Sequence, residues 1–268
     1  MRRVARRALS PATRGRRLDQ EIAALRAEMS EQTQRIYDRV IEFEIRTRRD
    51  LAYASDVEAA ASSSRFAVDV LVGARPFRYP WETLEYALAI SPRGGMALEF
   101  GVATGTTLRT IAERRGGELV YGFDSFDGLP EDWVTGMPAG SFARADLPEV
   151  PGAELVVGLF DDTLVGFLDG HPGPVDFLHV DSDLYSSAAT VLELTGPRLR
   201  EGSVILFDEF FNYPGWQRHE CLAWQEFVGR TGIAFDYLAY TYADCQLVAK
   251  VRATPGAAAP DPGPSASS

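Results

Sequence analysis

From about residue 75 onward, short apolar runs that are typical of β-strands alternate with segments of helical pattern. Strands are expected at 97–100, 118–123, 154–159, 175–180 and 203–207, with helical patterns near 106–115, 163–168, 186–199 and 218–230. Because these strands are almost continuously apolar, both of their faces should be buried. A mostly parallel sheet with helices on both faces, an α/β fold, meets that requirement.

The last two predicted strands must pair differently from the others. The runs "AFDYLAYTY" and "CQLVAKV" are separated only by "AD", which is too short for a crossover between parallel strands. We therefore expect the sheet to include an antiparallel C-terminal hairpin, within a domain that covers residues 80–252. Residues 253–268 are rich in proline, alanine and serine, a composition that predicts a disordered tail.

The N-terminal part of the chain follows a third pattern. Residues 1–17 contain seven arginines and no acidic residue, which predicts a flexible basic arm. Residues 18–79 are expected to form a helical extension, because no glycine or proline occurs between Leu18 and Tyr53. Apolar residues recur there every seven positions, at Ile22, Met29, Ile36 and Phe43. The intervening heptad positions turn polar after Leu25, so the seam of a coiled coil is incomplete; we predict a homo-oligomer formed through this helix.

Composition limits the partners that this chain can have. The formal net charge is −11 and the pI is about 4.8, so most of the surface would repel a phosphate backbone, and no nucleic-acid partner is expected. The two cysteines, Cys221 and Cys245, are too few for a disulfide framework and lack the spacing of a metal site. No signal peptide and no stretch of about 18 apolar residues is found, which predicts a cytoplasmic protein without a membrane partner.

The bend "LEFGVATGTT", Leu98 to Thr107, joins the first of these strands to a helical segment. Its two glycines, Gly101 and Gly105, either change the chain direction or allow a ligand to approach the backbone. A Walker loop is excluded, because threonine stands where its lysine should be, and the spacing GxxxG lacks the middle glycine of a dinucleotide fingerprint. Asp124 ends the next strand, where a carboxylate accepts hydrogen bonds from ribose hydroxyls or caps a turn.

Several further motifs follow in order: "YGFDSFDGLPEDW", "GLFDDTL", "HVDSDLYSS" and "FDEFFNYPGW". Together with the glycine bend, they make residues 80 to 251 resemble a class I S-adenosylmethionine-dependent methyltransferase. The resemblance is closest to the TylF/MycF-like macrocin O-methyltransferase group. It implies a Rossmann-like sheet with an antiparallel C-terminal hairpin, which agrees with the hairpin expected from the short "AD" turn.

The resemblance also implies a set of cofactor-binding residues. Glu99, Gly101 and Gly105 would line the methionine end of S-adenosylmethionine, and Asp124 would hold its ribose. The adenosine would be flanked by Ser125 and Phe126, and the adenine by Phe160 and Asp161. Core packing is the alternative for the Phe160 ring.

A cluster of acidic residues follows the fourth and fifth predicted strands. Asp181, Asp208 and Glu209 are the metal-ligand candidates, with Asp183 beside them, since several carboxylates without sulfur or imidazole suit Mg²⁺ or a similar divalent cation. The resemblance supports this cation, although its members have paired aspartates where this chain has Asp208 and Glu209. The alternatives for these acids are helix capping, binding of the cofactor's amino group and orientation of a substrate.

Methyl transfer from sulfur to oxygen requires removal of the hydroxyl proton. His219 is the candidate base, with Asp181 as a second catalytic candidate and Glu220 as a substitute. His171 and His179 lie in a predicted turn and a predicted strand and receive no role. Tyr185, Tyr213 and Trp216 are candidates for the wall of an acceptor pocket, and residues 130–142 for a mobile lid.

The predicted function is O-methylation of a hydroxyl group of a small molecule, and the resemblance implies a sugar of a natural product made in secondary metabolism. Two alternatives stay open. The first is a nicotinamide-dependent oxidoreductase that uses Gly101 and Asp124, although the middle glycine is missing. The second is a non-catalytic assembly module, in which the N-terminal helix carries the function and the sheet is a retained methyltransferase-like fold.

Overall fold

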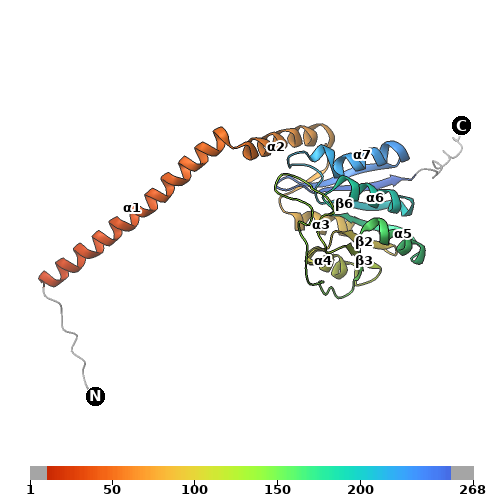
Figure 1. Cartoon of the computed structure of the whole chain (residues 1–268), viewed down its shortest axis with the longest axis horizontal. Coiled ribbons are helices and arrows are strands. Elements are labelled where there is room, and N and C mark those ends of the chain that lie inside the picture. Colours follow the sequence, from red (N-terminus) through yellow and green to blue (C-terminus); the bar gives the residue numbers. More distant parts are fainter. Residues whose placement is uncertain (1–10, 255–268) are drawn as a thin grey trace, which may run out of the picture. The chain divides into compact units, whose positions relative to one another are not determined.

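The computed structural model describes residues 11–254 and divides into two compact units at Ala54 and Ser55 (Figure 1). The first unit contains helix α1 (Pro11–Arg49) and the first turn of α2 (Leu51–Val70). The predicted helix is therefore present, but it begins earlier than Leu18, and a second helix follows Asp50. Residues 11–17 of the predicted basic arm are helical, and residues 1–10 and 255–268 lie outside the described residues.

The second unit is built on one sheet. Eight strands within residues 55–254 pair in the order β1-β7-β8-β6-β5-β2-β3-β4. Their bounds are β1 Arg75–Phe77, β2 Met96–Phe100, β3 Val120–Asp124, β4 Glu154–Val157, β5 Val175–Val180, β6 Leu199–Phe207, β7 Ala234–Thr241 and β8 Leu247–Ala253. All neighbours pair parallel except those of β8, which is antiparallel to both β6 and β7. The mostly parallel sheet with a C-terminal antiparallel hairpin is thus confirmed.

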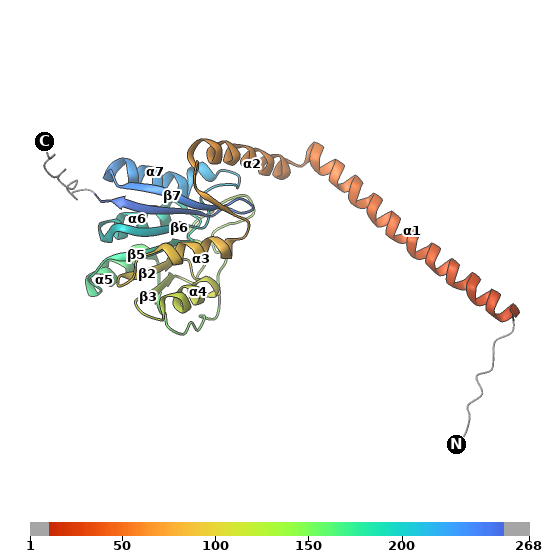
Figure 2. The ribbon, with the colours of Figure 1, turned by 180° about the vertical axis from the view of Figure 1, so that it is seen from behind.

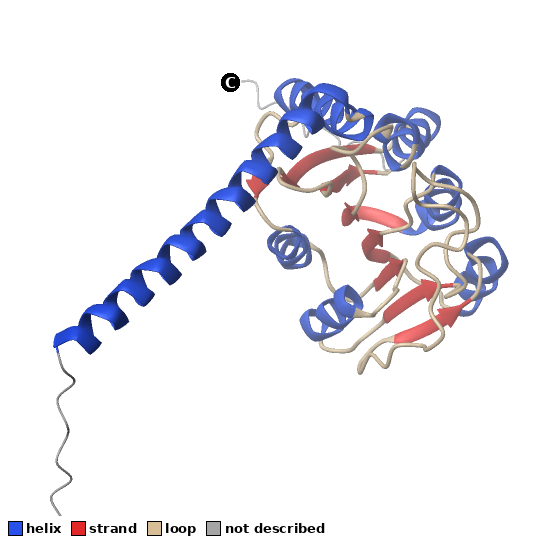
Figure 3. Cartoon of the chain, turned by 60° about the vertical axis from the view of Figure 1, so that its left-hand side comes forward, coloured by secondary structure: helices blue, strands red, loops and turns tan. Residues whose placement is uncertain are grey.

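Helices cover both faces of this sheet (Figures 2 and 3). They are α3 Pro80–Ile90, α4 Thr106–Arg115, α5 Phe160–Gly170, α6 Tyr185–Thr195 and α7 Glu220–Thr231, with short 3₁₀ turns at Gly196–Arg198 and Trp216–Arg218. One core cluster packs α3 and α4 on one face, and a second packs α2, α5, α6 and α7 on the other. Within residues 11–254, no helix combines the length and the apolar character needed to cross a membrane.

Two elements were not predicted from the sequence, β1 and α3. Helix α3 has a clear local cause, since Pro80 stands at its first position, where a missing N–H costs nothing. The carboxylate of Glu82 also accepts a hydrogen bond of 3.1 Å from the Tyr79 N–H, which satisfies a free donor at the start of the helix. The three-residue strand β1 pairs with β7 at the edge of the sheet.

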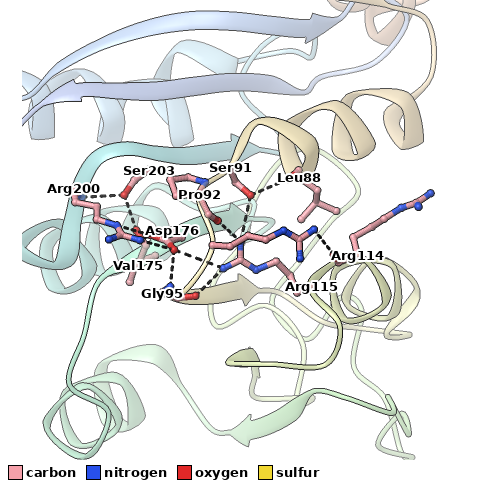
Figure 4. A network of polar contacts seen from close by, with 11 residues as sticks. Leu88, Ser91, Pro92, Gly95, Arg114, Arg115, Val175, Asp176, Arg200 and Ser203 are labelled. Atoms are coloured by element: carbon pink, nitrogen blue, oxygen red, sulfur yellow. Dashed lines mark hydrogen bonds and ion pairs between the residues drawn. The ribbon is translucent and has the colours of Figure 1, made fainter.

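The amino edge of the sheet is held by a buried polar network around Asp176, near the start of β5 (Figure 4). Its carboxylate accepts hydrogen bonds from Arg200 Nε at 2.7 Å, Arg200 Nη2 at 2.8 Å and the Gly95 N–H at 2.6 Å. Arg115 lies beside this carboxylate and donates to the carbonyl of Gly95 at 2.7 Å. The network joins β5, β6, α4 and the segment before β2, and leaves the carboxyl edge of the sheet for the site.

Candidate functional site

A cavity of about 540 Å³ lies at the carboxyl edge of the sheet. Each of five neighbouring strands contributes a lining residue where it ends: Gly101 after β2, Asp124 in β3, Gly158 after β4, Asp181 after β5 and Glu209 after β6. Ligands of open α/β sheets bind at this edge. The topology therefore brings together residues that are far apart in the sequence.

The glycine bend after β2 is explained first by contacts within the protein. Gly101 has a φ of +97°, and a Cβ atom built on it would lie 1.7 Å from the carbonyl oxygen of Asp181. Gly105 begins the turn into α4, and its Cβ would meet Val150 at 2.8 Å. Gly101 lines the cavity and Gly105 is not among its lining residues. Both glycines are thus required by the close approach of other chain segments.

Asp124 organises the same bend. One of its carboxylate oxygens accepts hydrogen bonds from the N–H groups of Val102 at 2.9 Å and Ala103 at 2.8 Å, and the other accepts one from Phe126 N–H at 2.7 Å. Asp124 also lines the cavity. Each oxygen retains acceptor capacity, because a carboxylate offers about four lone-pair sites. Its role toward ribose stays a prediction.

The residues predicted around adenosine separate into two groups. Ser125, Phe160 and Asp161 line the cavity. The Phe160 ring also contacts Phe100 edge-to-face at 5.1 Å between ring centroids, so it combines packing with exposure to the cavity. Phe126 is only 5% exposed, its ring packs in the core with α3 and α4, and it is not among the residues that line the cavity; its place beside the adenosine stays a prediction.

Glu99, His179 and Asp208 form a buried chain of polar contacts across β2, β5 and the end of β6. Glu99 and His179 are fully buried and stand directly opposite each other in neighbouring strands. His179 Nδ1 lies 2.9 Å from Glu99 Oε1, and its Nε2 lies 3.3 Å from Asp208 Oδ1. No role of His179 was predicted from the sequence. Its alternation with Asp181 and Asp183 in "HVDSD" was the available signal, because every second strand residue points to one face.

The electrostatics of this chain follow from burial and hydrogen bonding. Burial raises the pKa of Glu99. Burial alone would lower the pKa of His179, but hydrogen bonds to Asp208 and Glu99 raise it well above its ordinary value. For Asp208, burial favours a higher pKa, and the hydrogen bonds from His179 and Gln246 outweigh it and lower the pKa. Asp208 is therefore the carboxyl group of this set whose pKa is lowered, whereas burial raises that of Glu99.

The other acidic residues of the cluster are poorly solvated. Burial, together with the charge of Asp208, raises the pKa of Asp181 well above its usual range and that of Asp183 to about 7. The same causes raise the pKa of Glu209, whose Oε2 is buried and has no hydrogen-bond partner. Like charges held so close together favour a bound cation. One possible set of ligand atoms, from His179, Asp181 and Asp208, lies within 4.8 Å of one another.

The remaining catalytic candidates differ in how they are used. Glu220 is fully buried, and its carboxylate accepts hydrogen bonds from the N–H groups of Ser182 at 3.3 Å and Glu209 at 3.1 Å. It therefore fixes the loops after β5 and β6. His219 contacts the rings of Trp133 and Tyr213, and burial lowers its pKa. His219 is not among the residues that line the cavity.

Comparison with known proteins matches residues 98–210 to a methyltransferase domain. No relative is found among curated protein sequences. Among solved structures, the calicheamicin methyltransferase CalS11 aligns with a TM-score of 0.51 and 23% identity, over 83% of this chain and 92% of that one. Residues 98–210 thus belong to a methyltransferase domain, and the alignment with CalS11 supports the same fold for this chain.

Two further solved structures align with lower scores. The O-methyltransferase NovP has a TM-score of 0.46 and 20% identity, over 64% of this chain and 78% of that one. An O-methyltransferase from Bacillus cereus in complex with SAH has a TM-score of 0.43 and 16% identity, over 80% of this chain and 97% of that one. The predicted methyltransferase class is confirmed by the domain match, whereas the TylF/MycF-like subgroup stays a prediction.

In this methyltransferase domain, the segment between β3 and β4 covers one side of the cavity. Glu131, Trp133 and Phe142 from this segment line it. Ser186 Oγ on α6 donates a hydrogen bond of 2.5 Å to Glu131, and the Trp133 ring lies 5.5 Å from that of Tyr213. The segment predicted as a lid is therefore attached to the body at two points.

None of the three aromatic residues predicted for the acceptor pocket is among the residues that line the cavity, and Tyr213 instead packs against Trp133 and His219. The Tyr185 hydroxyl donates a hydrogen bond of 2.6 Å to Glu226 on α7. Trp216 is buried against Phe66, with its Nε1 donating to Ser62 at 3.1 Å. An aromatic residue that follows a strand can pack in the core or bind a ligand, and its position in the sequence does not distinguish these two roles.

Proposed function

We propose that this methyltransferase transfers the methyl group of S-adenosylmethionine to a hydroxyl group of a small molecule. The observation that carries the proposal is the continuity of one cavity from Asp124 and Ser125 to Asp181 and Glu209. The first pair lies where the resemblance puts the adenosine, and the second pair lies among groups suited to orienting a hydroxyl. Cofactor and acceptor then meet within one volume.

The residues around the cavity fit the proposed cofactor. Asp124 and Ser125 offer oxygen atoms for ribose hydroxyls, and Phe160 offers an aromatic face for adenine. Glu99 is fully buried and is not among the residues that line the cavity, so its place at the methionine end of the cofactor stays a prediction. A nicotinamide cofactor gains no comparable support, since the domain that matches is a methyltransferase domain.

A divalent cation is proposed to assist the reaction. Asp181 and Asp208 are two of its ligands, and Glu209 is the third ligand that the sequence predicts. The buried, partnerless Oε2 of Glu209 and the raised pKa values of Asp181 and Glu209 support a positive charge at this position. When bound, such a cation lowers the pKa of an acceptor hydroxyl and fixes its position.

The hydroxyl proton is proposed to pass to Asp181 or to His219. Asp181 lines the cavity, so its carboxylate can meet the hydroxyl of an acceptor bound there. His219 belongs to the ring cluster with Trp133 and Tyr213, and its lowered pKa keeps the imidazole neutral and able to accept a proton. The cavity lining favours Asp181.

For the acceptor, we propose a sugar hydroxyl of a natural product, in cytoplasmic secondary metabolism. The CalS11 structures carry the descriptions calicheamicin methyltransferase and TDP-rhamnose 3'-O-methyltransferase, and the aromatic rings of Trp133 and Phe142 in the cavity suit the apolar face of a sugar ring. Neither feature fixes the individual sugar.

The test is transfer of a labelled methyl group to a panel of nucleotide sugars, glycosylated natural products and catechols. Product on a sugar hydroxyl is expected, and its yield should fall when chelator removes divalent cations. Asp208→Asn should abolish transfer while leaving S-adenosylhomocysteine binding unchanged, whereas the distant surface variant Asp236→Asn should keep full activity. Full activity in chelator would contradict the proposed role of the cation. Product on catechols alone would contradict a sugar as the acceptor.

We also propose that the chain associates with a second copy of itself through α1. No described side chain of the helix up to Arg49 is buried. Seven apolar side chains follow one another at spacings of three, four or seven, which keeps them on one side of the helix: Leu18, Ile22, Leu25, Met29, Ile36, Val40 and Phe43. Val40 continues the stripe where the strict heptad position is Arg39. In proteins, most of the stability of a helix comes from packing of its apolar face.

Sedimentation equilibrium tests this association. Ile36→Glu places a charge in the stripe and should lower the average mass toward that of one chain. Ile45→Glu is the matched control, because Ile45 is similarly exposed, at 58% against 63%, but lies on the opposite side of the helix. Equal masses for the two variants would contradict the proposal.

A further inference from the structure

The environment of His179 distinguishes it from an ordinary core histidine. It stands in β5 two residues before Asp181, so both side chains leave the strand on the same face. The imidazole is fully buried, and both of its nitrogen atoms face carboxylates: Glu99 on β2 and Asp208 after β6. Only Asp208 keeps part of its side chain exposed, 26%, and Asp181 lines the cavity.

The contact with Glu99 fixes how this imidazole can act. Nδ1 lies 2.9 Å from Glu99 Oε1, so Nδ1–H donates to the carboxylate. Histidines that bind metal ions almost always donate their other ring N–H to a carboxylate, a carbonyl or water, which sets the ring orientation and makes the free nitrogen more basic. Glu99 and His179 form such a pair, with Nε2 directed toward Asp208.

The distances agree with ligands that share one ion. Two ligand atoms that are each about 2.1 Å from an ion lie about 3.0 Å apart at a right angle and about 3.4 Å apart at the tetrahedral angle. The distance between His179 Nε2 and Asp208 Oδ1 is 3.3 Å. A carboxylate oxygen of Asp181 lies within 4.8 Å of both atoms, so a small approach of this flexible side chain completes the set.

We propose that His179 Nε2 is a ligand of the divalent cation, together with Asp181 and Asp208, and that Glu99 orients it. The inference rests on the proposed cation and changes its coordination from three carboxylates to a mixed nitrogen and oxygen set. Glu209 is then a neighbour of the ion instead of its third ligand. Imidazole suits transition ions, whereas Mg²⁺ prefers oxygen ligands alone. The site should therefore select Mn²⁺, Co²⁺ or Zn²⁺ over Mg²⁺, and the ion replaces the proton on Nε2.

The test is electron paramagnetic resonance of the full chain with bound Mn²⁺, combined with calorimetric titration of Mn²⁺ and Mg²⁺. Coupling of the bound Mn²⁺ to a ¹⁴N nucleus is expected in the unmodified protein and should vanish in His179→Gln. His179→Gln should lower Mn²⁺ affinity by about 100-fold or more, and Glu99→Gln, which removes only the orienting charge, by about 10- to 100-fold. His171→Gln is the matched control, since His171 lies at the end of α5, where its Nδ1 hydrogen-bonds to the Phe167 carbonyl.

Each outcome decides the inference. Bound Mn²⁺ without ¹⁴N coupling, or equal affinities for Mn²⁺ and Mg²⁺ that His179→Gln leaves unchanged, would overturn it and leave a cation held by carboxylates. Absence of any cation binding would overturn it together with the proposed cation. Methyl transfer measured in chelator then shows separately whether the proposed O-methyltransferase activity stands. Because the ¹⁴N signal is read in the unmodified protein, a variant that fails to fold does not prevent the decision.

Discussion

Replacing Gly101 by alanine would disturb the junction between the glycine bend and the acidic cluster. The new Cβ would lie 1.7 Å from the Asp181 carbonyl oxygen, whereas real Cβ atoms essentially never come closer than 3.0 Å to such an atom. The ends of β2 and β5 would therefore have to separate by more than 1 Å. The residue would also be held at a φ of +97°, which an L side chain rarely adopts.

The expected effect has two parts that a control can separate. The left-handed backbone conformation alone costs about 1–2 kcal/mol in a residue with a Cβ. Gly94→Ala measures this part, because Gly94 has a similar φ of +102° and its Cβ would meet nothing within 4 Å. The forced separation is specific to Gly101, and a misplacement of about 1 Å at a reacting centre can cost about 100-fold in rate.

Urea unfolding and methyl transfer would be measured for both variants. Gly101→Ala should lower the free energy of unfolding by roughly 3 kcal/mol or more, the strain of the left-handed conformation plus that of overpacking, and lower the rate about 100-fold. Gly94→Ala should lose only the stability that the left-handed conformation costs, about 1–2 kcal/mol, and should keep its activity. If the two variants lose equal amounts of stability and activity, the close approach of the Asp181 carbonyl to Gly101 does not affect the reaction, and the prediction is wrong.

Three further predictions concern single side chains. Asp124→Ala should weaken S-adenosylhomocysteine binding by about 1–3 kcal/mol in calorimetry; unchanged affinity would contradict its predicted place at the ribose. Asp176→Ala leaves the buried guanidinium of Arg115 without its ion-pair partner and should lower the free energy of unfolding by about 3–5 kcal/mol, with Asp236→Ala, at an exposed ion pair, as the nearly neutral control. Trp133→Ala should raise the KM for the acceptor several-fold, by about 0.5–1.5 kcal/mol, without changing cofactor affinity; an equal loss of both would assign Trp133 to folding.

Much of the fold could be predicted because periodicity and chain connectivity determine it. Strands at Met96–Phe100 and Val175–Val180 lie within a residue of their expected bounds, since apolar runs between turn formers leave few alternatives. The antiparallel hairpin followed from the shortness of the connection, which the structure places at residues 242–246. β1 could not be found, because three residues carry no measurable period. The start of α3 does carry a signal in the sequence, which is Pro80 followed by Glu82.

The site was less predictable, because function depends on which segments approach one another. Gly101 signals a close approach, but the sequence does not say that the neighbour is the Asp181 carbonyl. Phe126 stands beside a cavity residue in sequence, yet its ring lies in the core. His179 shows the opposite case: it sits inside an apolar strand, and only the pairing of β2, β5 and β6 brings it between Glu99 and Asp208.

Calorimetric titration with S-adenosylhomocysteine tests the central claim that the cavity at the carboxyl edge of the sheet binds the methyl-donor cofactor. The unmodified chain should bind one equivalent with a dissociation constant in the micromolar range or tighter, NAD should not displace it, and the titration should weaken when alanine replaces Asp124. No heat of binding at any cation concentration, or displacement by NAD, would contradict the account.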